Sequence, residues 1–138
     1  EREFVFNLLN SINELEFSPC DGCTRQQMVQ RLRDSMATIH VKRLEGYGMS
    51  IIESMAAGRP VFLHRELAQN KSLLNWSIES ETAFFFSSEG EFINKALAFF
   101  ENQEFRHATQ ERCSKRIRQL INNQEQFNNL KSFLNNLV

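Results

Sequence analysis

The chain has 138 residues, of which 41% are hydrophobic, and this is the size and composition of one globular domain with a sizeable core. Its 16 basic and 17 acidic residues give a net charge of −1, so it has no positive field that would attract DNA or RNA, and we expect no nucleic-acid partner. No window approaches the ~18 uninterrupted apolar residues of a membrane-spanning helix, so we expect no spanning segment.

The first residues and the number of cysteines both bear on where in the cell the protein is located. The first residues, Glu-Arg-Glu-Phe, lack the basic and then apolar profile of a signal peptide. Three cysteines, an odd number, argue against a closed disulfide framework and for a reducing compartment. We therefore expect a cytoplasmic protein. Because the chain begins at Glu1 without an initiator methionine, we also expect it to be part of a longer protein.

The first part of the chain is predicted to alternate helices with strands. Apolar residues recur at helical spacing from Glu3 to Asn13, which predicts an amphipathic helix, and a short strand is predicted from Leu15 to Ser18. Thr24 is a natural N-cap for a helix from Arg25 to Ser35. The β-branched run from Ala37 to Val41 is typical of a buried strand.

The second part of the chain continues this alternation. Met49 to Ala57 is predicted to be a helix, which Gly58 and Pro60 end, because glycine favours the C-terminal cap and proline cannot continue a helix. The remaining predicted elements are a strand from Val61 to His64, a loop with one helical turn from Arg65 to Thr82, a strand from Ala83 to Ser87, and helices from Glu91 to Asn102, Glu104 to Ile121 and Gln124 to Leu137.

Short, almost entirely apolar strands that alternate with helices indicate a parallel sheet that is covered on both faces. The predicted fold is therefore α/β, with an open, mostly parallel, Rossmann-like sheet and helices on both faces. We assign residues 1–122 to one lobe. Residues 123–138 are predicted to form a C-terminal amphipathic helix of the same lobe, since their apolar side chains form one stripe.

The stretch "RLEGYGMSIIESMAAGRPVFL", residues 43–63, directly follows the predicted strand that ends at Val41. In an open parallel sheet, ligands bind beyond the carboxyl ends of the strands. Gly46 and Gly48 let the backbone approach a bound group, and the first N–H groups of the next helix point outward at the positive end of its dipole. These features predict a turn that binds phosphate.

Two carboxylates in the same stretch, Glu45 and Glu53, would repel a phosphate and need another explanation. An ionised glutamate accepts hydrogen bonds from vicinal hydroxyl groups. A ligand with a central diphosphate, a ribose on one side and a sugar on the other would satisfy the glycines, the helix start and the carboxylates together. The residues therefore predict that the ligand is a nucleotide-sugar.

The run "EGYGMSIIESMAAGRPV" resembles the donor-binding motif of retaining GT-B glycosyltransferases, especially those of family 4. That motif has two glutamates separated by seven residues, with Gly-Phe-Gly after the first, and Glu-Ala-Met-Ala and Gly-x-Pro-Val from the second onward. Glu45 and Glu53 have this spacing. The other residues that match the motif are Gly46, Gly48, Met55, Ala56, Gly58, Pro60 and Val61. The segments "TRQQMVQRLRDSMATIHV" and "IESETAFFFSS" are more loosely similar to their counterparts in the family.

The resemblance implies a hexosyltransferase-like enzyme that transfers a sugar, with retention of configuration, to a sugar, lipid or protein acceptor. It implies that Glu45 is catalytic and holds the sugar near the reacting carbon, and that Glu53 accepts hydrogen bonds from the ribose. Backbone N–H groups would stabilise the departing diphosphate. No metal or cofactor is implied. The donor-binding residues that it implies are Gly46, Tyr47, Gly48, Met49, Ser50 and Glu53.

The chain departs from the family pattern in two places. Lys42 and Arg43 stand where Pro-Ser is frequent, and the segment from Arg65 to Trp76 lacks the usual Gly-Gly-x-x-Glu turn. The first donor-lobe strands, with a basic pair that grips the diphosphate, and the acceptor lobe have no counterpart here. We therefore expect residues 1–122 to be a partial GT-B donor lobe, incomplete at its N-terminal side, that does not transfer sugar by itself.

Two other functions remain open. A nucleotide-sugar epimerase would share the fold and the phosphate turn while using other acids and bases, and a non-catalytic GT-B-like interaction module would keep the fold alone. Intact Glu45 and Glu53 argue against the module. Cys20 and Cys23 have metal-ligand or redox spacing, but no second pair follows, so we interpret them as loop thiols. His40 lies in an apolar strand and is interpreted as a hydrogen-bonded core histidine.

Overall fold

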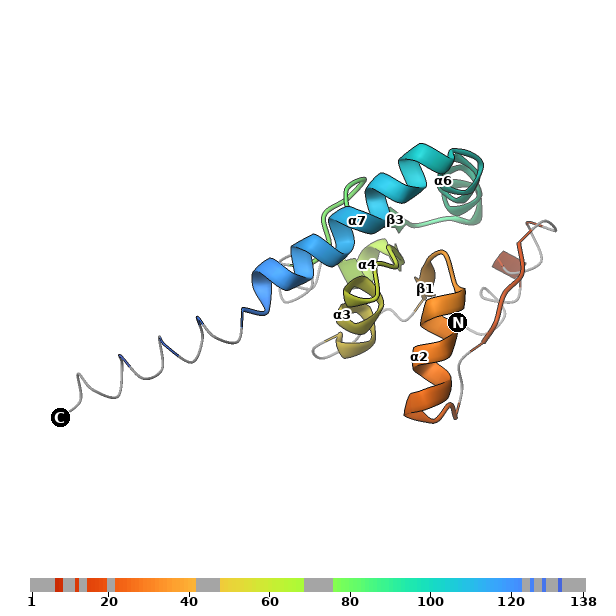
Figure 1. Cartoon of the computed structure of the whole chain (residues 1–138). Coiled ribbons are helices and arrows are strands. Elements are labelled where there is room, and N and C mark those ends of the chain that lie inside the picture. Colours follow the sequence, from red (N-terminus) through yellow and green to blue (C-terminus); the bar gives the residue numbers. More distant parts are fainter. Residues whose placement is uncertain are drawn as a thin grey trace.

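The computed structural model describes residues 7–8, 12, 15–19, 22–41, 48–68, 76–122, 125, 128 and 132. Figure 1 shows how the helices and strands of this part of the chain are arranged. In chain order the elements are α2 (Arg25–Asp34), β1 (Thr38–His40), α3 (Met49–Ala56), β2 (Val61–His64), α4 (Arg65–Ala68), β3 (Ala83–Phe86), α6 (Glu89–Glu101) and α7 (Gln103–Leu120). The predicted alternation of strands and helices is confirmed from α2 onward.

The three described strands form one parallel sheet in the order β1-β2-β3. Val61 of the central strand lies opposite Thr38 of β1 and opposite Ala83 of β3. The following residues of each strand pair one by one in the same register. Helical segments connect consecutive strands, as parallel pairing requires. The predicted α/β class with an open parallel sheet is therefore confirmed, and the arrangement is consistent with a Rossmann-like fold.

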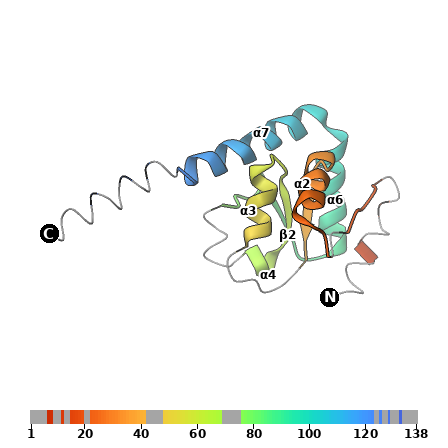
Figure 2. The same ribbon diagram turned by 60° about the horizontal axis from the view of Figure 1, so that its bottom comes forward.

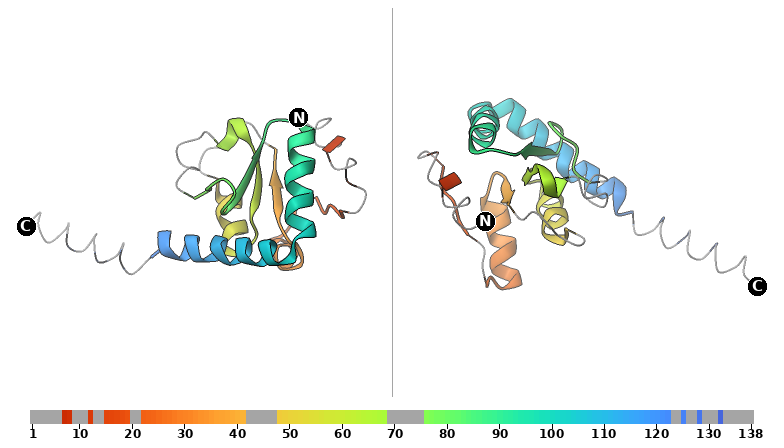
Figure 3. Two further views of the ribbon diagram at one scale, coloured as in Figure 1. Left: turned by 90° about the horizontal axis from the view of Figure 1, so that it is seen from above. Right: turned by 180° about the vertical axis from the view of Figure 1, so that it is seen from behind.

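Both faces of the sheet are covered, because alternate residues of each strand point to opposite sides. One side carries Val61 and Leu63, which pack in a core cluster with residues of α3, α4 and α7. The other side carries Phe62, Phe84 and Phe86, which pack in a second cluster with residues of α6. Figures 2 and 3 show α3 and α6 on opposite faces of the strands.

The ends of α2 and α3 follow from local capping groups, as the sequence predicts. The Thr24 hydroxyl accepts a hydrogen bond from the Gln27 N–H at 3.3 Å, and the Gln27 side-chain oxygen accepts one from the Thr24 N–H at 2.9 Å. This reciprocal pair is a capping box. Gly58 has φ 72° and donates its N–H to the Met55 carbonyl, which ends α3 before Pro60.

Two helix starts differ from the prediction by one or two residues. Helix α6 begins at Glu89 and not at Glu91, because Ser88 is its N-cap. The Ser88 hydroxyl accepts a hydrogen bond from the Glu91 N–H at 3.3 Å. Helix α7 begins at Gln103, where the Asn102 side chain is the cap. Capping side chains placed before the apolar stripe therefore set these boundaries.

The strand predicted from Leu15 to Ser18 is wrong, because residues 15–19 form no strand. Leu15 and Phe17 are half-buried and pack against the core cluster on the α6 side of the sheet. The Arg31 guanidinium donates to the Ser18 hydroxyl at 2.7 Å and also to the Pro19 carbonyl. The apolar side chains of this segment cover the sheet and do not extend it.

Two predicted helices fall mostly outside the described residues, the one from Glu3 to Asn13 and the one from Gln124 to Leu137. Leu8 and Ile12, from the first of them, are buried against the α6-side cluster. The single helical turn expected after β2 is α4, and residues 69–75 lie outside the description. The boundary between residues 122 and 123 stays a prediction.

Candidate functional site

The candidate site lies where the chain leaves the carboxyl end of β1 and enters α3. Residues 42–47, with the predicted Glu45, Gly46 and Tyr47, lie outside the described part of the chain. The other predicted site residues are Gly48, which precedes α3, and Met49, Ser50 and Glu53, which belong to it. The described geometry therefore covers the second half of the predicted motif.

Gly48 has φ 73° and ψ 36°, the left-handed conformation, and it is buried. Its carbonyl accepts hydrogen bonds from the N–H groups of Ile51 at 3.0 Å and Ile52 at 3.1 Å, so the helix starts here. The N–H groups of Met49 and Ser50 are the first of the helix and have no intrahelical acceptor. A left-handed residue followed by helical ones turns successive N–H groups to one side, which makes a concave anion-binding arrangement.

Helix α3 separates its buried and exposed side chains sharply. Ile51 and Met55 are fully buried in the core beneath it. The Met49 residue is 53% exposed, and Glu53 is exposed one turn further on. Since residues four apart lie on the same face of a helix, Met49 and Glu53 share the outward face. The Glu53 carboxylate can therefore reach a ligand that is bound at the start of the helix.

A chain of hydrogen bonds beneath α3 was not predicted from the sequence. The Ser54 hydroxyl is fully buried, donates to the Arg59 carbonyl at 3.0 Å and lies 2.6 Å from the Thr38 hydroxyl of β1. The Thr38 hydroxyl also lies 3.2 Å from Nε2 of His40. The interpretation of His40 as hydrogen-bonded is confirmed, although its residue is half-buried and not in the core. A serine on the inward face of an apolar helix is the sequence signal for such a contact.

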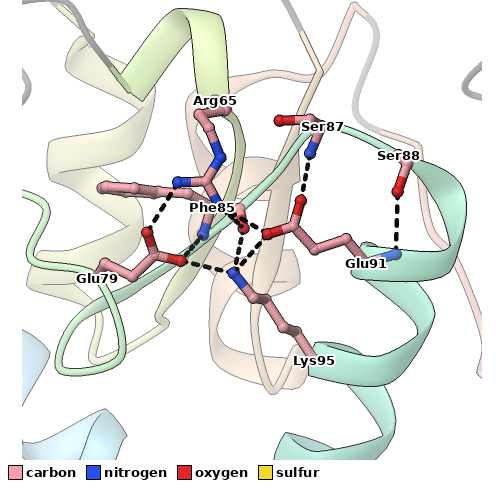
Figure 4. A network of polar contacts seen from close by, with 7 residues as sticks. All are labelled: Arg65, Glu79, Phe85, Ser87, Ser88, Glu91 and Lys95. Carbon is pink, nitrogen blue, oxygen red and sulfur yellow. Dashed lines mark hydrogen bonds and ion pairs between the residues drawn. The ribbon is translucent and has the colours of Figure 1, made fainter.

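At the other edge of the sheet, charged side chains surround the backbone of Phe85 in β3 (Figure 4). Nζ of Lys95 lies 2.5 Å from the Phe85 carbonyl, 2.6 Å from Glu79 and 3.0 Å from Glu91. The Arg65 guanidinium donates to Glu91 at 2.6 Å and to Glu79 at 3.2 Å. Glu79 accepts the Phe85 N–H at 3.3 Å. Side chains thus satisfy backbone groups that another strand would otherwise pair, which closes this edge.

The same contacts shift the pKa values of the charged groups. Hydrogen bonds from the Ser87 N–H and then from Lys95 lower the pKa of Glu91 to about 2. Burial acts to raise the pKa of Glu79, but the hydrogen bond and the charge of Lys95 outweigh burial, and the pKa lies below its usual value. The hydrogen bond to Glu91 raises the pKa of Arg65. Both carboxylates stay ionised beside cations, so this cluster is a structural network and not an acid–base pair.

Of the three cysteines, the structure describes Cys23 and Cys113. The Cys113 thiol is buried in α7 and donates to the Thr82 carbonyl at 3.2 Å, and burial raises its pKa to about 12. A thiol in such surroundings is inert. Cys23 is half-buried just before α2, and Cys20 lies outside the described residues, so their interpretation as loop thiols stays a prediction. Within the described ranges, no cluster of three or more His, Cys, Asp or Glu could hold a metal ion.

Comparison with family models, with curated proteins and with solved structures found no match. Two shallow hollows on the described surface lie along α7, between residues 103 and 122, and neither includes a residue of the candidate site. None of the helices in the described ranges has the length and apolar character needed to cross a membrane. The candidate site is therefore interpreted from its own geometry and from its motif.

Proposed function

We propose that this chain binds the nucleoside-diphosphate sugar of a retaining glycosyltransferase, with the diphosphate at the start of α3. The observation that carries the proposal is the left-handed Gly48, which opens α3 beyond the carboxyl end of β1 in a parallel sheet. The run "EGYGMSIIESMAAGRPV" spans this point, and its resemblance to the donor-binding motif of GT-B enzymes supports the same ligand.

The start of α3 favours an anion for three reasons. Gly48 adopts the left-handed conformation without strain because it has no side chain, and this directs the N–H groups that follow it. The N–H groups of Met49 and Ser50 come next, at the positive end of the helix dipole. Each anionic contact at a helix start contributes roughly 0.3 to 1 kcal/mol, and up to ~2 kcal/mol when it is partly buried.

The two glutamates of the motif have separate roles in this proposal. Glu53 lies on the exposed face of α3, one turn beyond Met49, and accepts hydrogen bonds from the ribose hydroxyl groups. Glu45 holds the sugar near its reacting carbon. The N–H groups at the helix start stabilise the negative charge that develops on the leaving diphosphate. A sugar, lipid or protein accepts the transferred group, and the proposal requires no metal.

Nuclear magnetic resonance tests the binding step directly. Amide shifts of 15N-labelled protein are recorded with UDP, GDP and ADP, and separately with pyrophosphate. We expect the Met49 and Ser50 amides to move with pyrophosphate and with at least one nucleotide, and the amides around Glu53 to move only with a nucleotide. If none of the nucleotides moves these amides, the proposal is wrong.

Two matched glycine variants separate binding from backbone strain. Gly48 and Gly58 are both left-handed, with φ 73° and 72°, and they flank opposite ends of α3. Gly48→Ala and Gly58→Ala should each lower the free energy of unfolding by ~1 to 2 kcal/mol, because a Cβ is strained in this conformation. Only Gly48→Ala should also weaken pyrophosphate and nucleotide binding. Equal binding losses in both variants would show that the helix start does not bind the ligand.

A glutamate pair tests the ribose contact. Glu53→Ala should weaken nucleotide binding by roughly tenfold to a hundredfold, since a hydrogen bond to a charged group contributes about 1.5 to 3 kcal/mol. Its effect on pyrophosphate binding should be small. Glu101→Ala removes an exposed carboxylate at the end of α6 and is the control. A loss of pyrophosphate affinity as large as the loss of nucleotide affinity would contradict the role given to Glu53.

A further inference from the structure

Strand β3 has an outer edge, the side that faces away from β2 in the described sheet. Every second residue of a strand directs its N–H and carbonyl groups toward the same side, and at this edge these residues are Ala83, Phe85 and the following Ser87. The Ala83 N–H donates to the Ile78 carbonyl at 3.1 Å, and the Ala83 carbonyl accepts a hydrogen bond from the Ser80 N–H at 2.9 Å. The backbone of the preceding turn therefore closes the beginning of this edge.

Side chains close the rest of the edge (Figure 4). The Phe85 N–H donates to the Glu79 carboxylate at 3.3 Å, and the Phe85 carbonyl accepts a hydrogen bond from Nζ of Lys95 at 2.5 Å. The Ser87 N–H donates to the Glu91 carboxylate at 2.9 Å. These side chains therefore occupy the position that the backbone of another strand would take.

The four charged side chains at this edge, which we call the edge network, hold one another in place. Lys95 lies 2.6 Å from Glu79 and 3.0 Å from Glu91. Arg65 contacts the same two carboxylates, at 3.2 Å and 2.6 Å. The side chains of the network are 27% to 39% exposed, so solvent reaches them. A partner strand could reach the Phe85 backbone only by displacing these ion pairs.

Strand β3 itself has the composition of a segment that pairs readily. Its sequence, AFFF, carries no charge, and aromatic residues favour strands. Short uncharged segments of this kind associate when their edge is exposed. A second copy of the chain offers the same edge, and a two-fold axis between two copies would place the two β3 strands antiparallel, so that each supplies donors and acceptors to the other.

We propose that the edge network prevents the chain from associating, through the outer edge of β3, with the same edge of a second copy. When the network is removed, the freed N–H and carbonyl groups of Phe85 pair with the backbone of the other copy. The edge lies on the opposite side of the sheet from β1, which leads to the candidate site, so this proposal does not rest on the proposed function.

The double variant Glu79→Ala/Lys95→Ala tests the proposal, because it removes the side chains that bind the N–H and the carbonyl of Phe85 at the shortest distances. Glu111→Ala/Lys115→Ala is the control, since both residues are exposed on α7 and lie outside the edge network. Each variant loses one acidic and one basic residue, so the net charge stays at −1. Sedimentation velocity measures association from about 1 μM to about 1 mM. We expect the first variant to associate at least tenfold more tightly than the unmodified protein, and the control to behave like the unmodified protein.

Amide hydrogen exchange at Phe85, measured by mass spectrometry with single-residue fragmentation, shows whether β3 forms the contact. At the lowest concentration, exchange in Glu79→Ala/Lys95→Ala should be roughly tenfold faster than in the unmodified protein, because a hydrogen bond to a charged group is lost. At the highest concentration exchange should slow again, since the second copy protects the amide. In the unmodified protein the exchange rate should not depend on concentration.

Three results would overturn the proposal. The first is association of Glu79→Ala/Lys95→Ala that does not exceed that of the control. The second is association without renewed protection of the Phe85 amide, because another surface then forms the contact. The third is exchange at Phe85 that slows with concentration in the unmodified protein, because the edge is then open although the network is intact.

Two substitutions of Lys95 provide a second test that does not depend on folding of the double variant. Lys95→Ala removes the closest donor to the Phe85 carbonyl but leaves the Phe85 N–H bound to Glu79. Lys95→Arg keeps a cation beside both carboxylates. Lys95→Ala should associate more tightly than the unmodified protein, whereas Lys95→Arg should not. Equal association of these two variants would show that the cation does not close the edge.

Discussion

Glu91 accepts three hydrogen bonds at the start of α6. The donors are the Ser87 N–H at 2.9 Å, the Arg65 guanidinium at 2.6 Å and the Lys95 ammonium at 3.0 Å. Its pKa falls to about 2 from an ordinary value of 4.5. Because the folded pKa lies below the unfolded one, ionised Glu91 stabilises the native state above about pH 4.5, and this stabilisation is lost as the pH falls toward 2.

We expect Glu91→Gln to lower the free energy of unfolding by about 1 to 2 kcal/mol at pH 7, since a neutral amide forms weaker bonds and the partly exposed site is screened by solvent. The difference from the unmodified protein should shrink as the pH falls from about 4.5 to about 2. Urea denaturation across this pH range measures it. Glu101→Gln is the control. A difference that stays constant with pH would mean that the charge of Glu91 contributes nothing.

Helix α2 is linked to the body of the molecule by the side chain of Arg59. None of its 10 residues is buried, and Val29 is 42% exposed. The Arg59 guanidinium donates to the Leu32 carbonyl and to the Arg33 carbonyl, each at 2.7 Å. These are among the last carbonyl groups of the helix, which have no intrahelical donor. Arg59 therefore links the end of α2 to the turn between α3 and β2.

We expect Arg59→Ala to lower the free energy of unfolding by about 1 to 2 kcal/mol, because two charge-assisted hydrogen bonds and the helix-dipole contact are lost. Amide hydrogen exchange should speed up in α2 more than in β2 or β3. Arg59→Lys keeps the charge but cannot direct two donors at two carbonyl groups, so it should recover only part of the loss. Exchange that speeds up equally in every element would contradict a local role.

In the described part of the chain, buried residues form two core clusters, one on each face of the sheet. On the α6 side, the ring of Phe62 lies 4.8 Å from that of Phe84 and 5.4 Å from that of Phe92, measured between centroids. Phe99 of α6 is fully buried among them, and Phe100 is half-buried at the border. The strands β2 and β3 are buried along their whole length, whereas β1 is only half-buried.

We expect Phe99→Ala to lower the free energy of unfolding by about 3 to 5 kcal/mol, since it removes a fully buried ring and leaves a cavity. This is a large fraction of the ~5 to 15 kcal/mol that stabilises a typical domain, so the melting temperature should fall clearly. Circular dichroism during urea and thermal unfolding measures both quantities. Phe100→Ala should cost less. Equal losses in the two variants would contradict the burial described here.

Local patterns predicted most of the secondary structure, because helix caps and apolar periods act within about four residues. The capping box at Thr24 and the glycine end of α3 at Gly58 follow the sequence directly. The candidate site was predicted by the same means, since its glycines and the helix that follows are adjacent in the chain. The prediction failed at Leu15 to Ser18, where apolar and polar residues alternate as in a strand but the residues pair with no described strand.

The sequence by itself determined the α/β class and the alternation of strands and helices, and it predicted the candidate site after the first described strand. Only the tertiary structure decided the strand order, the side of the sheet that each helix covers, and the contacts among distant residues. The bond from Thr38 to Ser54 spans 16 positions, and that from Arg65 to Glu91 spans 26. Such pairs form because parallel strands bring remote segments together. The local periodicity of the sequence does not indicate which remote side chains will come into contact.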